Sequence, residues 1–132
     1  MNIAIISFLG IIIGATLQYF FTTYLENQRH IRTLKTQAYT DFLKYLADRV
    51  HIKSDDKKEA LARITDAMAR ICLYGSKKVI QKLSFFRKLG GELNTQEQQN
   101  AFVNVIASMR EDGYERSVTD INDLAHILLS KK

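Results

Sequence analysis

The chain has 132 residues and a formal net charge of +5, and 46% of its residues are hydrophobic. This length leaves room for one small domain beside an apolar N-terminal segment, and the hydrophobic content excludes a disordered chain as the default. The sequence contains no proline and a single cysteine, so proline does not interrupt its helices and no internal disulfide can form.

The first segment, residues 3–23, carries no charged side chain. As a helix rising about 1.5 Å per residue it would be about 31 Å long, which matches a bilayer core of about 30 Å. No basic leader precedes it and no small-residue cleavage site follows it, so a removable secretory signal is not expected. The sequence predicts a transmembrane helix over residues 1–24; the less favoured alternative is a helix that lies in the membrane interface.

Residues that favour a membrane interface follow at the end of this segment. Tyr19 and Tyr24 suit the headgroup level, and Arg29 and Arg32 come directly afterwards, whereas no Lys or Arg precedes the segment. The positive-inside rule then places the N-terminus outside and residues 25–132 in the cytoplasm. We therefore expect a single-pass protein of the bacterial inner membrane, with lipid headgroups as the contacts of these four residues.

A polar stripe runs along the predicted transmembrane helix. At about 100° per residue its members fall within an arc of about 120°, and they are Ser7, Gly10, Gly14, Gln18 and Thr22. The two glycines form a G-x-x-x-G pair that lets helices approach closely, and the glutamine amide needs a polar partner in hydrocarbon. The stripe predicts self-association, either by helix packing alone or around a water-filled pore that the polar side chains line.

Residues 25–132 show helical periodicity and no strand pattern. The next segment has apolar residues at spacings of three and four, namely Ile31, Leu34, Ala38, Phe42, Leu46 and Val50. No Gly or Pro separates this segment from the membrane segment, so one long helix is expected to leave the bilayer and enter the domain.

A second helix is expected to start at residues 54–56 and to end at Gly75. Its predicted inner face is Leu61, Ile64, Met68, Ile71 and Cys72. The cysteine is interpreted as a small buried hydrophobic residue in a reducing compartment.

Three shorter helices follow. Ser76 opens one that Gly90 and Gly91 end, and its predicted core side is Val79, Ile80, Leu83, Phe86 and Leu89. Thr95 and Gln98 form a capping box before the next helix, which Gly113 ends as a left-handed cap. That helix has Phe102, Val105, Ile106 and Met109 on its apolar side. A last helix over residues 119–130 is expected to bury Ile121, Leu124, Ala125 and Leu128. The predicted fold class is all-α: one N-terminal transmembrane helix continuing into a cytoplasmic bundle of about five helices over residues 25–132.

Positive charge is concentrated in one predicted helix. Residues 76–89 contain no acid and five bases, which are Lys77, Lys78, Lys82, Arg87 and Lys88. A solvated surface would show the same pattern; the functional alternative is a site for the phosphates of a nucleic acid, a nucleotide or an anionic lipid. Tyr74, Phe85 and Tyr114 have the side chains to stack on bases, although aromatic residues in a small bundle usually belong to its core.

No pattern in the sequence indicates catalysis or a bound metal. His30, His51 and His126 are not spaced with one another or with other ligands as metal sites require. The Arg–His spacing of one class of helical RNases, glycine-rich phosphate loops and nucleophile elbows are all missing. The sequence predicts neither an enzyme nor a cofactor.

Behind the membrane segment the chain contains, in this order, the segments AYTDFLKYL, ICLYGSKKVIQKL and AFVNVIASMREDGY. These resemble a broad group of small bacterial membrane proteins, some of them effectors in anti-phage defence, and the chain is similar to the membrane effectors of the Hailong system. That resemblance implies an oligomeric ion channel whose cytoplasmic part binds single-stranded DNA oligomers, or another anionic nucleotide regulator, as the gating signal. The chain also resembles the accessory membrane proteins of type VI-B CRISPR systems, which are pore-like. The alternative from another class is a membrane-tethered adaptor that recruits a protein or nucleic acid without conducting.

Overall fold

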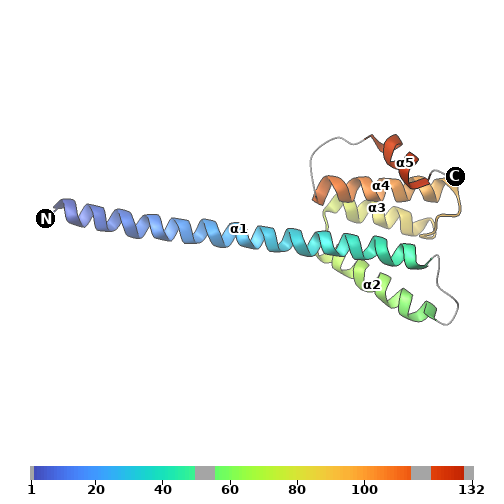
Figure 1. The fold of residues 1–132 in the computed structure, drawn as a ribbon, viewed down its shortest axis with the longest axis horizontal. Coiled ribbons are helices and arrows are strands. Elements are labelled where there is room, and N and C mark those ends of the chain that lie inside the picture. The colour runs from blue at the N-terminus through green and yellow to red at the C-terminus, as the bar shows by residue number, and fades with distance from the viewer. Residues whose placement is uncertain (1, 50–55, 114–119, 130–132) are drawn as a thin grey trace. The chain divides into compact units, whose positions relative to one another are not determined.

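The computed structural model describes residues 2–49, 56–113 and 120–129. These residues form five helices and no strand (Figure 1): α1 (Asn2–Arg49), α2 (Lys57–Tyr74), α3 (Lys77–Lys88), α4 (Gln96–Gly113) and α5 (Ile121–Leu129). The all-α fold class predicted from the sequence is confirmed. Some predictions concern positions outside the described residues, and these are Val50, His51, Ser54, Asp55, Tyr114, Thr119 and Ser130.

The first helix is continuous from Asn2 to Arg49, as the lack of a helix breaker after the apolar segment predicts. It contains a segment that is long and apolar enough to cross a membrane, and no part of that segment is buried within the protein. The chain divides into two compact units, Met1–Leu34 and Lys35–Lys132, and α1 supplies residues to both. The boundary of the membrane segment near residue 24 stays a prediction.

The core of the Lys35–Lys132 unit is built by α1, α2, α3 and α4. Its buried side chains include Ala38, Tyr39, Phe42, Leu46, Ile64, Ala67, Ile71, Val79, Leu83, Phe86, Ala101, Val105 and Met109. Their spacings of three and four along each helix are those that the sequence shows, and each large side chain contributes about 1.5–3 kcal/mol when fully buried. Phe86 of α3 also packs against Phe102 of α4 at a ring-centroid distance of 5.8 Å.

The helix boundaries of α3 and α4 follow from their capping residues. The Ser76 hydroxyl accepts a hydrogen bond from the Val79 amide at 3.3 Å and caps the start of α3. Gly90 and Gly91 end that helix at φ angles of +105° and +65°, which residues with a side chain rarely adopt. Thr95 and Gln98 exchange hydrogen bonds of 3.1 and 3.2 Å, so the predicted capping box is confirmed.

The structure corrects the predicted inner face of α2. Leu61 is 54% exposed and Cys72 is exposed as well, so the prediction that both are buried is wrong. The buried side of the helix is Ala60, Ile64, Ala67 and Ile71. Two of these residues are alanines, so a pattern of large apolar side chains alone does not identify the buried side.

The predicted burial of α5 is wrong at two positions. Ile121 is 48% exposed and Leu128 is 42% exposed, while Leu124 and Ala125 are half-buried. Among the described residues this helix packs mainly on α4, which leaves its other sides exposed. Gly113 is the last described residue of α4 and its φ is not positive, so the predicted left-handed cap at this glycine is also wrong.

We predict that Gly75→Ala lowers the free energy of unfolding by about 1–3 kcal/mol. A Cβ atom at Gly75 would lie 2.5 Å from the Ile71 carbonyl oxygen, which is backbone and cannot move away cheaply. Gly113→Ala is the matched control, since its Cβ would meet only Thr36 Oγ1, at an ordinary 3.8 Å. Denaturant unfolding of the two variants in detergent should show a loss for the first, and no loss or a gain of up to about 1 kcal/mol for the second. Equal stabilities would contradict the role of Gly75.

Candidate functional site

Some polar side chains of the α1 stripe have no hydrogen-bond partner among the described residues. Ser7 donates its hydroxyl proton to the Ile3 carbonyl at 2.9 Å, which satisfies it within the helix. The side chains of Gln18 and Thr22 make no hydrogen bond among the described residues and are exposed. In hydrocarbon an unpaired amide is costly, so within a membrane Gln18 would require a partner from another molecule or from water.

The glycines of the same stripe are open on the outside. A Cβ atom added at Gly10 or Gly14 would meet nothing within 4 Å. Neither glycine is therefore needed for packing or backbone conformation within one copy. Their absent side chains leave a shallow place on the helix where a second helix can approach closely.

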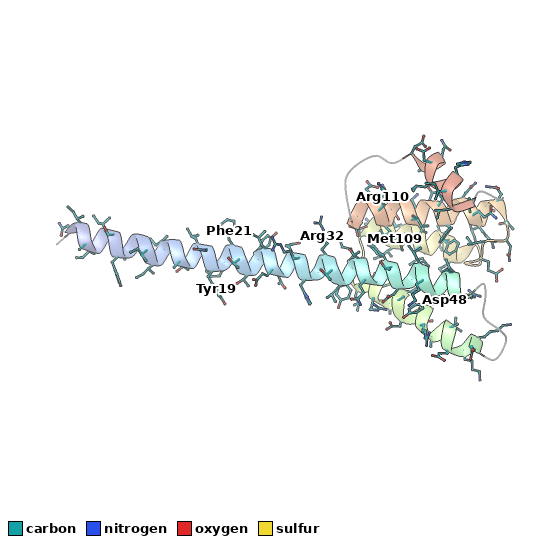
Figure 2. The ribbon with its side chains drawn as sticks, in the orientation of Figure 1. Tyr19, Phe21, Arg32, Asp48, Met109 and Arg110 are labelled. Carbon is teal, nitrogen blue, oxygen red and sulfur yellow. The ribbon has the colours of Figure 1, made fainter. Side chains whose placement is uncertain are left out.

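The residues assigned to the membrane interface follow the apolar segment along α1. Tyr19 and Tyr24 are 70% and 63% exposed, and Arg29 and Arg32 are exposed as well. Figure 2 shows Tyr19 and Phe21 on opposite sides of α1, with Arg32 further along. Aromatic rings followed by arginines are the arrangement that membrane interfaces favour, and no described residue covers these four side chains.

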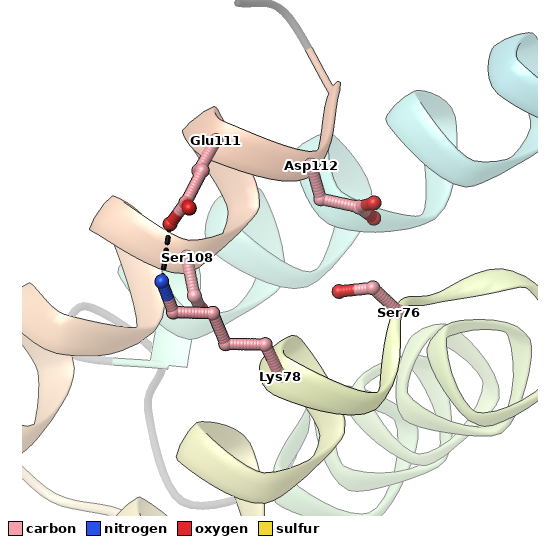
Figure 3. Close-up of a pocket in the computed structure, with 5 residues that line it drawn as sticks. All are labelled: Ser76, Lys78, Ser108, Glu111 and Asp112. Carbon is pink, nitrogen blue, oxygen red and sulfur yellow. Dashed lines mark hydrogen bonds and ion pairs between the residues drawn. The ribbon is translucent and has the colours of Figure 1, made fainter. Parts of the chain in front are cut away.

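The five bases predicted as an anion site are exposed, but they do not form one uniform surface. Lys78 makes an ion pair with Glu111 of α4, shown in Figure 3. Arg87 lies against the turn after α3, where a Cβ on Gly91 would come within 3.1 Å of its guanidinium. Lys77, Lys82 and Lys88 make no ion pair among the described residues. Arg87 makes no such ion pair either, so Lys78 alone of the five bases is paired with an acid among these residues.

An exposed aromatic ring lies among these lysines. Phe85 is 51% exposed, so the usual assignment of such a residue to the core is wrong here. It stands three residues from both Lys82 and Lys88, a spacing that places all three on neighbouring positions of the helix surface. An aromatic ring between cations suits a ligand that combines planar groups with phosphates.

A polar pocket of about 340 Å³ lies between the start of α3 and the end of α4. It is lined by Ser76, Lys78, Ser108, Glu111 and Asp112 (Figure 3). Asp112 accepts hydrogen bonds from Lys35 Nζ at 3.1 Å and from the Tyr39 hydroxyl at 2.5 Å, both on α1. The sequence suggests only turn carboxylates here, because Tyr39 and Asp112 are 73 positions apart.

The charges around this pocket are balanced in pairs. Two carboxylates face two lysines, and the buried Ser108 hydroxyl donates to the Val105 carbonyl at 2.7 Å. Burial and the hydrogen bond to Asp112 raise the pKa of Tyr39 above its ordinary value, so the phenol holds its proton. The described residues contain no group of three or more His, Cys, Asp or Glu that could hold a metal ion.

Comparisons with known proteins give no match to this chain. No family model, no curated protein and no solved structure is significantly similar to it. Its function is therefore inferred from the polar stripe, the bases of α3 and the pocket between α3 and α4.

We predict that Tyr39→Phe removes part of the alkaline loss of stability. The folded state raises the pKa of Tyr39 above the unfolded value of 10.0, so the resulting stability is complete below pH 10 and declines as the pH rises above it. Thermal unfolding between pH 8 and 11 should show a steeper decline for the wild type than for Tyr39→Phe. Tyr24→Phe changes an exposed tyrosine and should keep the wild-type profile. Parallel profiles for all three proteins would contradict the role of Tyr39.

Proposed function

We propose that the chain is a single-pass protein of the bacterial inner membrane that assembles with copies of itself into a gated, ion-conducting pore. The observation that carries this proposal is the unpaired Gln18 amide in an apolar helix segment of which nothing is buried. A single copy in a bilayer leaves that amide unsatisfied, whereas a ring of copies supplies neighbouring amides or water.

The orientation follows from the charges around the segment. Arg29 and Arg32 come after the segment and no Lys or Arg comes before it, which favours a cytoplasmic location for the Lys35–Lys132 unit. In the assembly, Ser7, Gln18 and Thr22 face the pore, while Gly10 and Gly14 allow neighbouring helices to pack. A ring of uncharged polar side chains selects weakly among ions.

The gating signal in this proposal is an anionic regulator that binds α3, such as a single-stranded DNA oligomer. Lys77, Lys82 and Lys88 supply free charge for phosphates, and Phe85 supplies an exposed ring for a base. A phosphate that takes Lys78 from Glu111 changes the wall of the pocket where α3 meets α4. The regulator shifts the equilibrium between closed and open forms only by its difference in affinity for the two. A role as an effector in anti-phage defence is what the resemblance to that group implies.

The second candidate is a membrane-tethered adaptor that uses the same anchor and basic helix but does not conduct. The exposed interface residues of α1 favour it as much as they favour a pore. The two functions differ in whether the polar stripe is needed beyond anchoring.

We predict that the wild-type protein conducts ions across liposome membranes and that the double variant Gly14→Leu, Gln18→Leu does not. The variant removes the close-packing position and the amide while it keeps the segment apolar. Thr16→Leu with Thr23→Leu is the matched control, since these residues lie on the opposite side of the helix and Thr16 already donates to the Ile12 carbonyl at 2.7 Å. Ion flux should match the wild type in the control and fall to the level of protein-free liposomes in the stripe variant.

The flux is measured with single-stranded DNA present and again after its digestion, so that a closed channel is distinguished from a missing one. If the oriented, oligomeric wild type stays silent in both conditions, the pore is rejected and the adaptor is accepted.

We predict that single-stranded DNA oligomers bind the protein with a steep salt dependence that depends on α3. Lys82→Gln with Lys88→Gln removes two phosphate contacts and should reduce the slope of log K against log salt concentration by about 1.4. Lys44→Gln with Lys57→Gln changes the net charge equally outside α3 and should leave the slope unchanged. Fluorescence anisotropy from about 50 to 200 mM salt measures both. An equal reduction by the two variants would show that net charge, and not α3, attracts the oligomer.

A further inference from the structure

One side of α2 is exposed and nearly uncharged over its whole length. The residues on this α2 face are Leu61, Ala62, Thr65, Ala69, Cys72 and Leu73. Leu61 is 54% exposed and Leu73 is 75% exposed. The hydroxyl of Thr65 is already satisfied within the helix, since it donates to the Leu61 carbonyl at 2.8 Å. A helix face in contact with water normally carries charges, so this face has the composition of a contact surface.

A second apolar position is exposed on α5. Ile127 is 76% exposed and follows Asp120 by seven residues and Asp123 by four, which places the three on one stripe of the helix. Asp120 caps the helix by accepting from the Asn122 amide at 2.9 Å. Asp123 is exposed and makes no ion pair among the described residues. The α5 stripe is therefore acidic at its start and apolar further on.

Whereas the α5 stripe begins with negative charges and continues with an apolar residue, the α2 face begins with a positive charge and continues with apolar residues. Lys58 begins it, three residues before Leu61 and four before Ala62. Both Lys57 and Lys58 lie in the first turn of α2, where the helix dipole disfavours cations. A carboxylate from outside would relieve that cost. If α5 of one copy runs parallel to α2 of the next, with Asp123 opposite Lys58, then Ile127 lies opposite Ala62. The small side chain of Ala62 leaves room for Ile127.

We propose that the α5 stripe of one copy docks on the α2 face of the next copy. The occupant is a second copy of this chain because the two surfaces complement each other in charge, in size and in order along the helix. Within one copy the surfaces do not meet: α5 packs on α4, and Figure 1 shows α2 and α5 on opposite sides of the bundle. The contact is therefore heterologous, and repetition from copy to copy closes into a ring when the rotation permits.

This interface rests on the proposed function in one respect: the contact is stable only if the copies share one membrane. An exposed helix-on-helix contact is smaller than the roughly 800 Å² per partner of a stable free interface. Copies that share one bilayer meet at a high effective concentration, at which such a contact is sufficient. The interface makes no use of the polar stripe or of ion conduction.

The test is disulfide cross-linking of the full chain in native membranes. In a Cys72→Ser background, the double variant Ala62→Cys, Ile127→Cys is oxidised and separated on a non-reducing gel. Each copy then carries both ends of the contact, so we expect a ladder of dimers, trimers and larger species, whereas each single-cysteine variant gives no ladder. Circular dichroism checks that the helical content of all variants equals that of the wild type.

Charge exchange provides the second measurement. Lys58→Glu or Asp123→Lys, added singly to the double-cysteine protein, should reduce the ladder about fivefold, the upper range for an exposed ion pair, and the two together should restore it. No ladder from the folded double-cysteine protein overturns the proposal. Dimers from Ala62→Cys alone also overturn it, because they show two α2 faces in contact.

The outcome is independent of the flux measurement. A ladder without ion flux keeps this interface and rejects the pore. Ion flux without a ladder keeps the pore and rejects this interface.

Discussion

The carboxylate of Asp112 holds together the parts of the Lys35–Lys132 unit that are far apart in sequence. It accepts from Lys35 and Tyr39, which lie one turn apart on α1, and it stands in the last turn of α4. A Cβ atom on Gly75 would lie 3.3 Å from the Tyr39 hydroxyl, so the turn between α2 and α3 packs against the same hydroxyl. Three chain segments thus meet at one buried phenol. The pocket beside it exists because the start of α3 and the end of α4 are both fixed there.

This arrangement gives the charges of the unit two different environments. The ion pair of Lys35 and Asp112 is largely covered, with side-chain exposures of 18% and 16%, and such pairs resist competition from ions in solution. Lys78 and Glu111 are more than half exposed, and their pair is weak by comparison. The covered pair is thus the more resistant of the two to a competing anion, and the exposed pair is the more easily broken. In the proposed function, the second contact carries the signal and the first keeps the fold intact while it does so.

Most of the fold was predictable from the sequence because local rules decide it. The caps of Ser76 and Thr95, the glycines after α3 and the uninterrupted α1 each depend on residues within one turn of each other. The buried side of α2 was predicted only in part: Ile64 and Ile71 are buried as expected, but Leu61 and Cys72 are not. Periodicity shows that a helix has a broad apolar surface, but it does not show which part of that surface a neighbouring helix covers. The contact of Tyr39 with Asp112 and the exposure of Phe85 depend likewise on distant helices. Of the candidate site, the sequence identified the bases of α3 but not that Glu111 takes one of them.

The glycines of the chain fall into two groups with different evolutionary consequences. Gly75, Gly90 and Gly91 are required by the fold of a single copy, through a close backbone approach in one case and positive φ angles in the others. Any relative with these turns is under pressure to keep them, whatever it does. Gly10 and Gly14 have open space around them, so the fold of a single copy does not require glycine at either position. If natural variants retain glycine at these two positions, the selecting force comes from a neighbouring molecule.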